Sequence, residues 1–371
     1  MTFFYSIGKF NGDNGAAGMM EAGVCAASGC RRADQQIRGG MMIRKTRNLV
    51  RLMAAAGVLA FATMSSAQAA TTVRLGHVGE PGSLMDVTAN EFAKRVNSKL
   101  GDKATVETYG SSQLGNDTEM LRKLKLGTID LALPSTVMSS VDPVFALFEM
   151  PFLIKDHAHM ARVQQNEYIV GKMAEAAEKN GYVLLALWEN GFRNITNNKR
   201  PIVKPEDLQG IKLRTPSGEW RLRMFKSYGA NPTPMAYSET FVALQTGAVD
   251  GQENPLAQIY PAHFYEVQKY LSMSHHVYTP VSFLSGASWK RLPEDVRAII
   301  KEVAIEMQPV ALEYGAQMDK DLLGKLKEKG MEVNDIDQAA FVKASDAIYK
   351  EFEATAPEGK KMIETIQSLR D

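Results

Sequence analysis

Short strand-like patterns alternate with amphipathic helical patterns through most of the chain, and this alternation limits the fold more than any other feature. Residues 73–77 alternate apolar with polar side chains, and a break at Pro81 precedes a segment in which apolar residues recur every four positions. Strand-like runs at 104–109 and 129–133 are separated by a helical pattern that we expect Asp117 to cap. This order predicts an α/β fold with layers of helices on parallel strands.

The rest of the chain continues the alternation. A helical pattern over 156–179 leads to a strand of buried type at 182–188, and another strand-like run follows at 211–215. Pro293 then opens a helical pattern that ends at Gly330, which corresponds to about 50 Å at 1.5 Å per residue. Because one domain of this size does not need so long a helix, we expect it to cross from one domain to a second.

Residues 41–69 have the three parts of a secretory signal peptide. Four basic residues precede a 13-residue uncharged run, residues 52–64, and an Ala-Gln-Ala sequence ends at Ala69. The run is shorter than the roughly 20 residues that a membrane-spanning helix needs. We therefore expect cleavage after Ala69 and export, and we interpret residues 1–40 as an extension from a misassigned start codon.

Both cysteines, Cys25 and Cys30, precede the expected cleavage site. The exported chain would therefore have no disulfide, no thiol nucleophile and no cysteine-based metal site. It would carry 35 basic and 39 acidic side chains, a balance that does not favour nucleic acid or an anionic membrane surface as a partner. The fold must depend on its hydrophobic core, which a chain of this length is able to build.

Common enzyme signatures are absent from residues 70–371: there is no P-loop, no G-x-G-x-x-G after a strand, no H-E-x-x-H and no G-x-S-x-G. The pairs His157/His159 and His275/His276 lack the i, i+4 spacing of a zinc site on a helix. We interpret these histidines as solvated or hydrogen-bonded. The sequence predicts no catalytic residue, no metal site and no cofactor.

Two arginines follow predicted strands. Arg214 lies at the end of the run 211–215, just before a helical pattern, where open α/β sheets place their ligand contacts. Arg193 follows the strand at 182–188. An arginine in such a place offers a carboxylate two parallel charge-assisted hydrogen bonds. The alternative for both residues is an ion pair with a neighbouring carboxylate, and spacing alone does not choose between them.

Residues 234–255, with the sequence PMAYSETFVALQTGAVDGQENP, carry a resemblance that spacing cannot supply. Together with further blocks they resemble the extracytoplasmic solute-binding proteins of TRAP transporters, the DctP-type family. The blocks occur in the family's order and spacing, and they are SQLG at 112–115, LQGIKLRTP at 208–216, FYEVQK at 264–269 and LPED at 292–295.

The resemblance implies a two-domain periplasmic solute-binding fold that closes around its ligand at hinge strands. One domain would comprise 70–190 and 280–319, and the other 191–279 and 320–371. Three positions match the family individually: Arg214 the arginine that pairs with a ligand carboxylate, Arg193 a second basic residue near it, and Asn254 an amide that hydrogen-bonds the ligand. The small and large membrane permease subunits would be the partners.

The remaining ligand contacts and the ligand itself are less constrained. We expect further contacts from segments near 77–80 and 135–138, and from residues around the two helix starts after Arg214. These candidates are His77, Glu80, Ser135, Ser217, Trp220 and Tyr237. Trp188, Phe192 and Phe283 are aromatic residues that face either the cleft or the core. Aromatic side chains favour an aromatic or short 2-oxo acid, whereas hydroxyl-binding groups such as His77 and Glu80 favour a sugar acid.

Two other functions fit the same scaffold. A periplasmic sensor would pass ligand-induced closure to a signalling receptor instead of a permease. A periplasmic lyase would need a general base beside the bound acid, for which His77 and Glu80 are the candidates.

Overall fold

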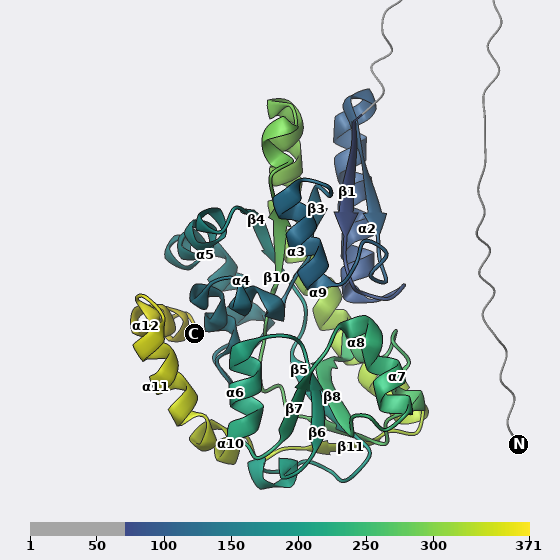
Figure 1. The fold of residues 1–371 in the computed structure, drawn as a ribbon, viewed down its shortest axis with the longest axis vertical. Coiled ribbons are helices and arrows are strands. Elements are labelled where there is room, and N and C mark those ends of the chain that lie inside the picture. The colour runs from purple at the N-terminus through teal and green to yellow at the C-terminus, as the bar shows by residue number, and fades with distance from the viewer. Residues whose placement is uncertain (1–70) are drawn as a thin grey trace, which may run out of the picture. The chain divides into compact units, whose positions relative to one another are not determined.

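The computed structural model describes residues 71–371, and the expected start codon, signal peptide and cysteines lie outside this range. Two sheets organise this part of the chain (Figure 1). The first has the spatial order β2-β1-β3-β10-β4. Its strands are β1 (Thr71–Gly76), β2 (Ala104–Tyr109), β3 (Leu131–Ala132), β4 (Val183–Trp188) and β10 (Val281–Ser285).

The second sheet has six strands in the order β11-β9-β5-β8-β6-β7. Its strands are β5 (Arg193–Asn197), β6 (Lys212–Thr215), β7 (Asn231–Pro234), β8 (Gly251–Pro255), β9 (Tyr270–Met273) and β11 (Glu332–Asp335). The α/β fold with two domains, one on each sheet, agrees with the prediction. The chain passes from the first sheet to the second between β4 and β5, and returns between β9 and β10.

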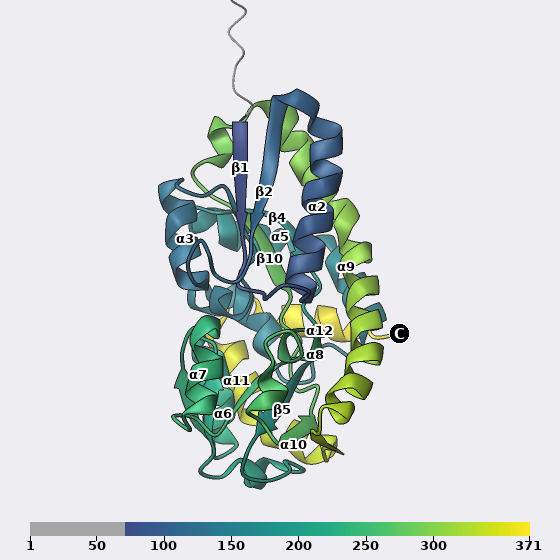
Figure 2. The same cartoon turned by 90° about the vertical axis from the view of Figure 1, so that its right-hand side faces the viewer.

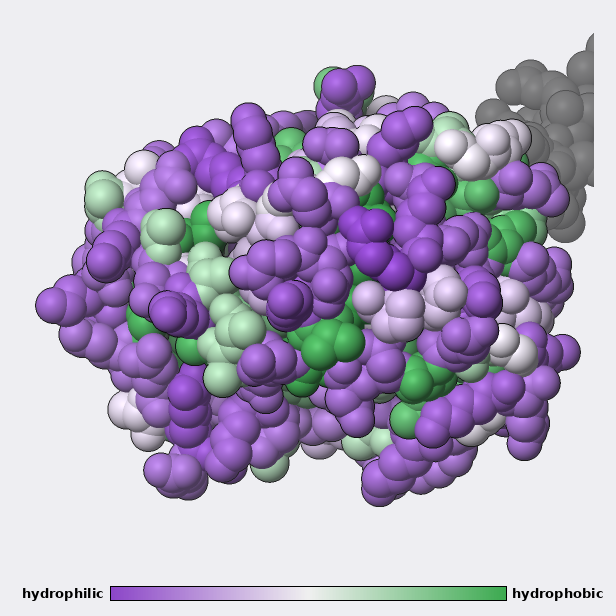
Figure 3. Space-filling model, turned by 90° about the horizontal axis from the view of Figure 1, so that it is seen from below, coloured by the Kyte–Doolittle hydropathy of each residue, from purple (hydrophilic) through white to green (hydrophobic). Residues whose placement is uncertain are grey.

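Helices cover both sheets. They are α2 (Leu84–Leu100), α3 (Asp117–Leu126), α4 (His157–Gln165), α5 (Glu167–Lys179), α6 (Glu219–Ser227), α7 (Thr240–Gln245), α8 (Leu256–Ile259), α9 (Glu294–Glu328), α10 (Gln338–Ala344), α11 (Asp346–Thr355) and α12 (Gly359–Ser368). In residues 71–371 no helix combines the length and the hydropathy that crossing a membrane requires. The face of the molecule in Figure 3 is mostly hydrophilic, with smaller hydrophobic areas between the polar side chains.

The alternation predicted parallel strands, but both sheets also contain antiparallel pairs. β1 pairs in parallel with β2 and β3, but β10 is antiparallel to both β3 and β4. In the second sheet β5 is antiparallel to β8 and β9. The reason is connectivity: β5 and β10 are the strands that enter each sheet from the other domain, so neither arrives through a crossover helix on its own sheet.

Two local predictions are wrong: the residue that caps α3, and the single helix over 156–179. Asn116, not Asp117, caps α3, because its side chain accepts from the backbone N–H of Glu119 while the Glu119 carboxylate accepts from the backbone of Asn116. The pattern over 156–179 contains two helices, α4 and α5. Asn166 separates them, and its side chain caps α5 by accepting from the N–H of Ile169.

The long helix predicted after Pro293 is α9, 35 residues from Glu294 to Glu328. It packs on α2, β4 and α4 and also on α8, which follows a strand of the second sheet. Figure 2 shows α9 running along one side past both sheets. The domain-spanning helix is therefore confirmed.

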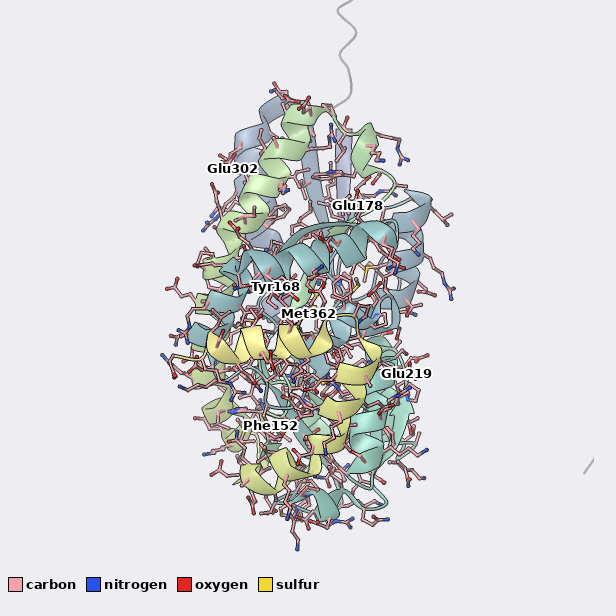
Figure 4. All side chains as sticks on the ribbon, turned by 90° about the vertical axis from the view of Figure 1, so that its left-hand side faces the viewer. Phe152, Tyr168, Glu178, Glu219, Glu302 and Met362 are labelled. Atoms are coloured by element: carbon pink, nitrogen blue, oxygen red, sulfur yellow. The ribbon has the colours of Figure 1, made fainter. Side chains whose placement is uncertain are left out.

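The C-terminal helices also pass from one sheet to the other. α10 follows β11 of the second sheet, whereas α12 packs on α5 and on the 3₁₀ helix Pro143–Glu149. Figure 4 shows α12, marked by Met362, lying beside α5, marked by Tyr168. Met362 is fully buried, and the Tyr168 hydroxyl donates to Glu358 at 2.6 Å.

Three of the aromatic residues considered for the cleft belong to the interior. Trp188 and Phe283 lie with Phe92 in the core beside the first sheet, and the Trp188 indole N–H donates to the carbonyl of Ala304 in α9 at 2.8 Å. Phe192 packs against Tyr278, where the chain crosses between the sheets.

Candidate functional site

A pocket lies where parallel strands of both sheets end, the place at which α/β sheets usually bind ligands. Val78 and the segment 135–137 follow β1 and β3 of the first sheet, while Arg214 and Asn254 lie at the ends of β6 and β8 of the second. The pocket measures about 390 Å³, part of which is open to solvent. Its lining residues are Val78, Met85, Asp117, Ser135, Thr136, Val137, Asn190, Arg193, Arg214, Pro216, Tyr237, Asn254 and Gln258.

Arg214 is the cation of this pocket that has no carboxylate partner. Its Nε and Nη2 both donate to the carbonyl of Met235, at 3.2 and 2.8 Å, and no Asp or Glu of residues 71–371 lies within ion-pair distance. The side chain is 2% exposed. Burial and the nearby charge of Arg193 lower the pKa of Arg214 to about 10, so the guanidinium stays charged at neutral pH.

Arg193 differs from Arg214 because it is already paired. Its Nε donates to Glu253 Oε2 at 2.5 Å, and its Nη2 donates to Glu253 Oε1 at 3.0 Å and to Asn254 Oδ1 at 2.9 Å. Asn254 in turn donates from Nδ2 to Gln252 at 2.6 Å. Register explains the contact, since β5 and β8 are neighbouring antiparallel strands with Asn194 opposite Asn254.

Behind the pocket, Arg221 on α6 extends this buried network to the first domain. It donates to Glu253 Oε2 at 2.6 Å, to Glu149 at 2.9 Å and to the Thr279 hydroxyl at 2.9 Å. The two arginines and two glutamates of this network balance each other's charge. Arg193 and Arg221 outweigh the effect of burial and hold the pKa of Glu253 far below its usual range.

Asp117 is a lining residue that sequence reasoning considered only as a helix cap. It is the first residue of α3 and therefore approaches the pocket from the first domain. Burial raises the pKa of Asp117 to about 6 against the opposing effect of Arg214 and Arg193. The sequence signal for Asp117 is its place two residues after the SQLG block, one of those that carried the family resemblance.

The other six predicted site residues divide into four groups. Ser135 and Tyr237 line the pocket, as do Arg214, Arg193 and Asn254. Ser217 lines an adjoining hollow that shares Asp117 and Arg214 with the pocket. Glu80 lies in a third hollow, which includes Tyr237, and its carboxylate accepts from Ser111 at 2.7 Å.

His77 and Trp220 are not among the residues that line the pocket. His77 is fully buried behind Gly110, and burial lowers its pKa to about 4. Trp220 packs edge-on against Phe352 of α11 because it lies on the α6 face turned toward the C-terminal helices. Neither position was readable from spacing, since each depends on a segment remote in the chain.

Residues 75–355 match the family described as bacterial extracellular solute-binding protein, family 7, also called DctP. The chain belongs to this family. The match includes every lining residue of the pocket and confirms the resemblance drawn from the sequence blocks. Proteins of this family are solute-binding proteins.

Known relatives support the same assignment. The chain is 30% identical over 334 residues to the 2,3-diketo-L-gulonate-binding periplasmic protein YiaO of Escherichia coli, covering 88% of this chain and all of that one. A TRAP periplasmic solute-binding protein of Polaromonas sp. JS666, solved bound to D-erythronate, is 32% identical with a TM-score of 0.77, covering 81% and 99%. The sugar acid-binding protein DctPAm of Advenella mimigardefordensis, solved with galactonate, is 33% identical with a TM-score of 0.77, covering 81% and 98%.

Proposed function

We propose that this protein is exported to the periplasm and is the substrate-binding subunit of a TRAP transporter, which binds an organic acid through its carboxylate and delivers it to the small and large permease subunits. The observation that carries the proposal is Arg214, a buried guanidinium without a carboxylate partner in residues 71–371. Such a group is costly to leave unpaired, and a ligand carboxylate compensates it with two directed hydrogen bonds.

The ligand class follows from this contact. A sugar acid, an aromatic acid and a short 2-oxo acid all present the carboxylate that Arg214 requires, and the relatives solved with D-erythronate and galactonate support the sugar acids. A neutral analogue would displace water from Arg214 without replacing the hydrogen bonds and charge pairing that the guanidinium needs, so the site would reject the analogue.

Closure of two domains around the ligand would complete the site. We propose domains of 70–190 plus 280–319 and 191–279 plus 320–371, connected by the crossing segments and α9. Ligand contacts made from both sides, such as Asp117 from one domain and Arg214 from the other, exist only in a closed form and would drive closure. The closed form would then dock on the permease.

The proposal includes no catalysis. The two candidate bases do not flank the pocket together with Arg214: His77 is not a lining residue, and Glu80 lies in a separate hollow. A general base must reach the bound acid within hydrogen-bond distance or through one water.

A thermal-shift screen tests the proposal directly. The protein is expressed with its own leader, purified from the periplasm, unfolded and refolded to remove carried ligand, and heated with sugar acids, C4-dicarboxylates, 2-oxo acids and aromatic carboxylates. An acid that binds the folded state raises the unfolding midpoint by mass action, whereas the matched amides and alcohols do not. A midpoint raised only by neutral compounds, or by nothing in the panel, would contradict the proposal.

A further inference from the structure

Five of the twelve buried side-chain atoms that lack a hydrogen-bond partner in residues 71–371 belong to residues that line the pocket. Asp117 Oδ1, Thr136 Oγ1, Asn190 Oδ1 and both amide atoms of Gln258 are buried and have no hydrogen-bond partner in the part of the chain that the structure describes. Thr136, Asn190 and Gln258 are each at most 3% exposed. Because a buried polar atom normally has a partner, a group of them around one pocket indicates that the ligand provides the missing hydrogen bonds.

Most of these atoms need a donor. Asn190 shows this most clearly, since its Nδ2 donates to the Thr279 carbonyl at 3.0 Å and to Ser135 Oγ at 3.1 Å, which fixes the amide and leaves Oδ1 free. The ionised Asp117 carboxylate only accepts, and the Gln258 amide oxygen also accepts. A ligand that suits this lining must therefore bring hydrogen-bond donors in addition to its carboxylate.

The candidate ligand classes differ in this property. A saturated acid without hydroxyl groups, a 2-oxo acid without hydroxyl groups and succinate have no donor when they are ionised, and an unsubstituted aromatic ring has none either. Hydroxyl groups donate and accept, so they suit Asp117, Asn190, Thr136 and both ends of the Gln258 amide. The lining thus separates hydroxylated acids from the other acids that Arg214 alone would accept.

Charge restricts the ligand further. Arg193 and Arg221 are neutralised by Glu253 and Glu149, which leaves Arg214 as the unpaired cation of the lining and Asp117 as its unpaired anion. One ligand carboxylate has Arg214 as its partner. A second carboxylate would have no cation of the lining to pair with and would lie in the same small pocket as Asp117.

Resting on the proposed function, we propose that the ligand is a polyhydroxylated monocarboxylate and that Asp117 is the residue that selects its hydroxyl groups over a bare carbon chain. Arg214 orients the carboxylate from the second domain. Asp117, Thr136 and Asn190 bind the hydroxyls from the first domain and the segment that leaves it, and Gln258 binds them from the second.

Calorimetry tests this inference by comparing the affinities of acids of equal chain length for the exported protein after its carried ligand has been removed. Erythronate is compared with butanoate, 2-oxobutanoate and succinate, and galactonate with hexanoate. A site built for hydroxyl groups rejects analogues that lack them. Whichever of erythronate and galactonate binds more tightly should bind at least about 100-fold more tightly than the acids of matched chain length without hydroxyl groups. Asp117→Ala should reduce that ratio at least about tenfold, and Asp117→Asn, which keeps an acceptor oxygen, should retain more of it.

Glu178→Ala is the control, because Glu178 is an exposed carboxylate on α5 (Figure 4) and is not among the residues that line the pocket. It should leave every affinity unchanged. Equal affinities within each matched set, tighter binding of succinate, or an undiminished ratio in Asp117→Ala would overturn this inference while leaving the proposed function intact. Failure of every acid to bind would instead overturn the proposed function and this inference with it.

Discussion

Arg193 donates two hydrogen bonds to the carboxylate of Glu253, from Nε to Oε2 at 2.5 Å and from Nη2 to Oε1 at 3.0 Å. Both side chains are at most 4% exposed. This pairing assigns different tasks to the two arginines that the sequence had presented alike. Arg193 pairs with Glu253 and donates to Asn254, whereas Arg214 donates to the carbonyl of Met235 and has no carboxylate partner in residues 71–371.

Replacing Arg214 should remove ligand binding without unfolding the protein. With the acid that gives the largest thermal shift, we expect Arg214→Ala to weaken binding by about 2–5 kcal/mol, because the ligand carboxylate is left buried and unpaired. Arg214→Lys should recover only part of the affinity, since lysine cannot donate two parallel hydrogen bonds. Calorimetry measures the affinity, and circular dichroism the fold.

The control for Arg214 is Arg223→Ala. Arg223 is an arginine of α6 that is 37% exposed and pairs with Glu219 at the surface. It should bind the acid as the wild type does. Wild-type affinity in Arg214→Ala would contradict the role given to this guanidinium.

Glu253 should matter for stability more than for binding. Glu253→Gln leaves two buried arginines without their shared carboxylate, and we expect it to lower the free energy of unfolding by about 3–5 kcal/mol. Urea unfolding at pH 7 measures the loss. Glu332→Gln, which changes a surface partner of Lys269, should alter stability by no more than about 0.5 kcal/mol.

The same carboxylate predicts a dependence on acid. Because the folded state lowers the pKa of Glu253, its stabilising effect is present above its ordinary pKa near 4.5 and is lost as the pH falls below that value. The stability difference between wild type and Glu253→Gln should therefore shrink on acidification. A difference that stays constant from pH 7 to pH 3.5 would show that Glu253 is not ionised in this network.

His157 predicts the opposite trend with pH. It bridges Glu189 and Asp319 of α9, at 3.1 and 3.2 Å. Burial alone would lower its pKa, but these two carboxylates outweigh it and raise the pKa of His157 to about 10. Its stabilisation is fully present below about pH 6.5 and is lost as the pH rises toward 10.

We therefore expect His157→Gln to be less stable than wild type at pH 6 by on the order of 2–4 kcal/mol, and to approach it at pH 9.5. Urea unfolding across this range measures the difference. His263→Gln, at a histidine whose side chain is 58% exposed, is the matched control and should differ little at any pH. A gap that widens with pH would contradict the assignment.

Gly218 should control how closely the domains approach. A Cβ there would lie 3.0 Å from Ser139 Oγ and 3.1 Å from Thr136 Cγ2, both on the other domain. Gly218→Val should hold the two segments apart and weaken binding of the screened acid by about tenfold or more, because closure contacts are lost. Gly324→Ala, in α9 with open space around it, controls for the loss of a glycine.

The sequence was informative where the physics is local. Apolar spacing predicted β1, β2, α2 and the full extent of α9, because the buried face of a helix or strand shows in the sequence as apolar residues at a regular spacing. It failed at Asn166, which divides one apparent helix into two, because the pattern of apolar residues continues across the capping residue.

The family blocks predicted the two-domain fold and the ligand contacts proposed for Arg214 and Asn254, and the rule for open α/β sheets predicted that Arg214 lies at a strand end. Which charges remain free was decided by tertiary structure alone. Arg193 and Arg221 pair with Glu253 and Glu149 over sequence separations of 32 to 72 residues. The residues next to an arginine in the sequence do not reveal a partner so far away along the chain. For the same reason only the folded chain placed Trp188 in the core, removed His77 from the pocket and brought Asp117 opposite Arg214.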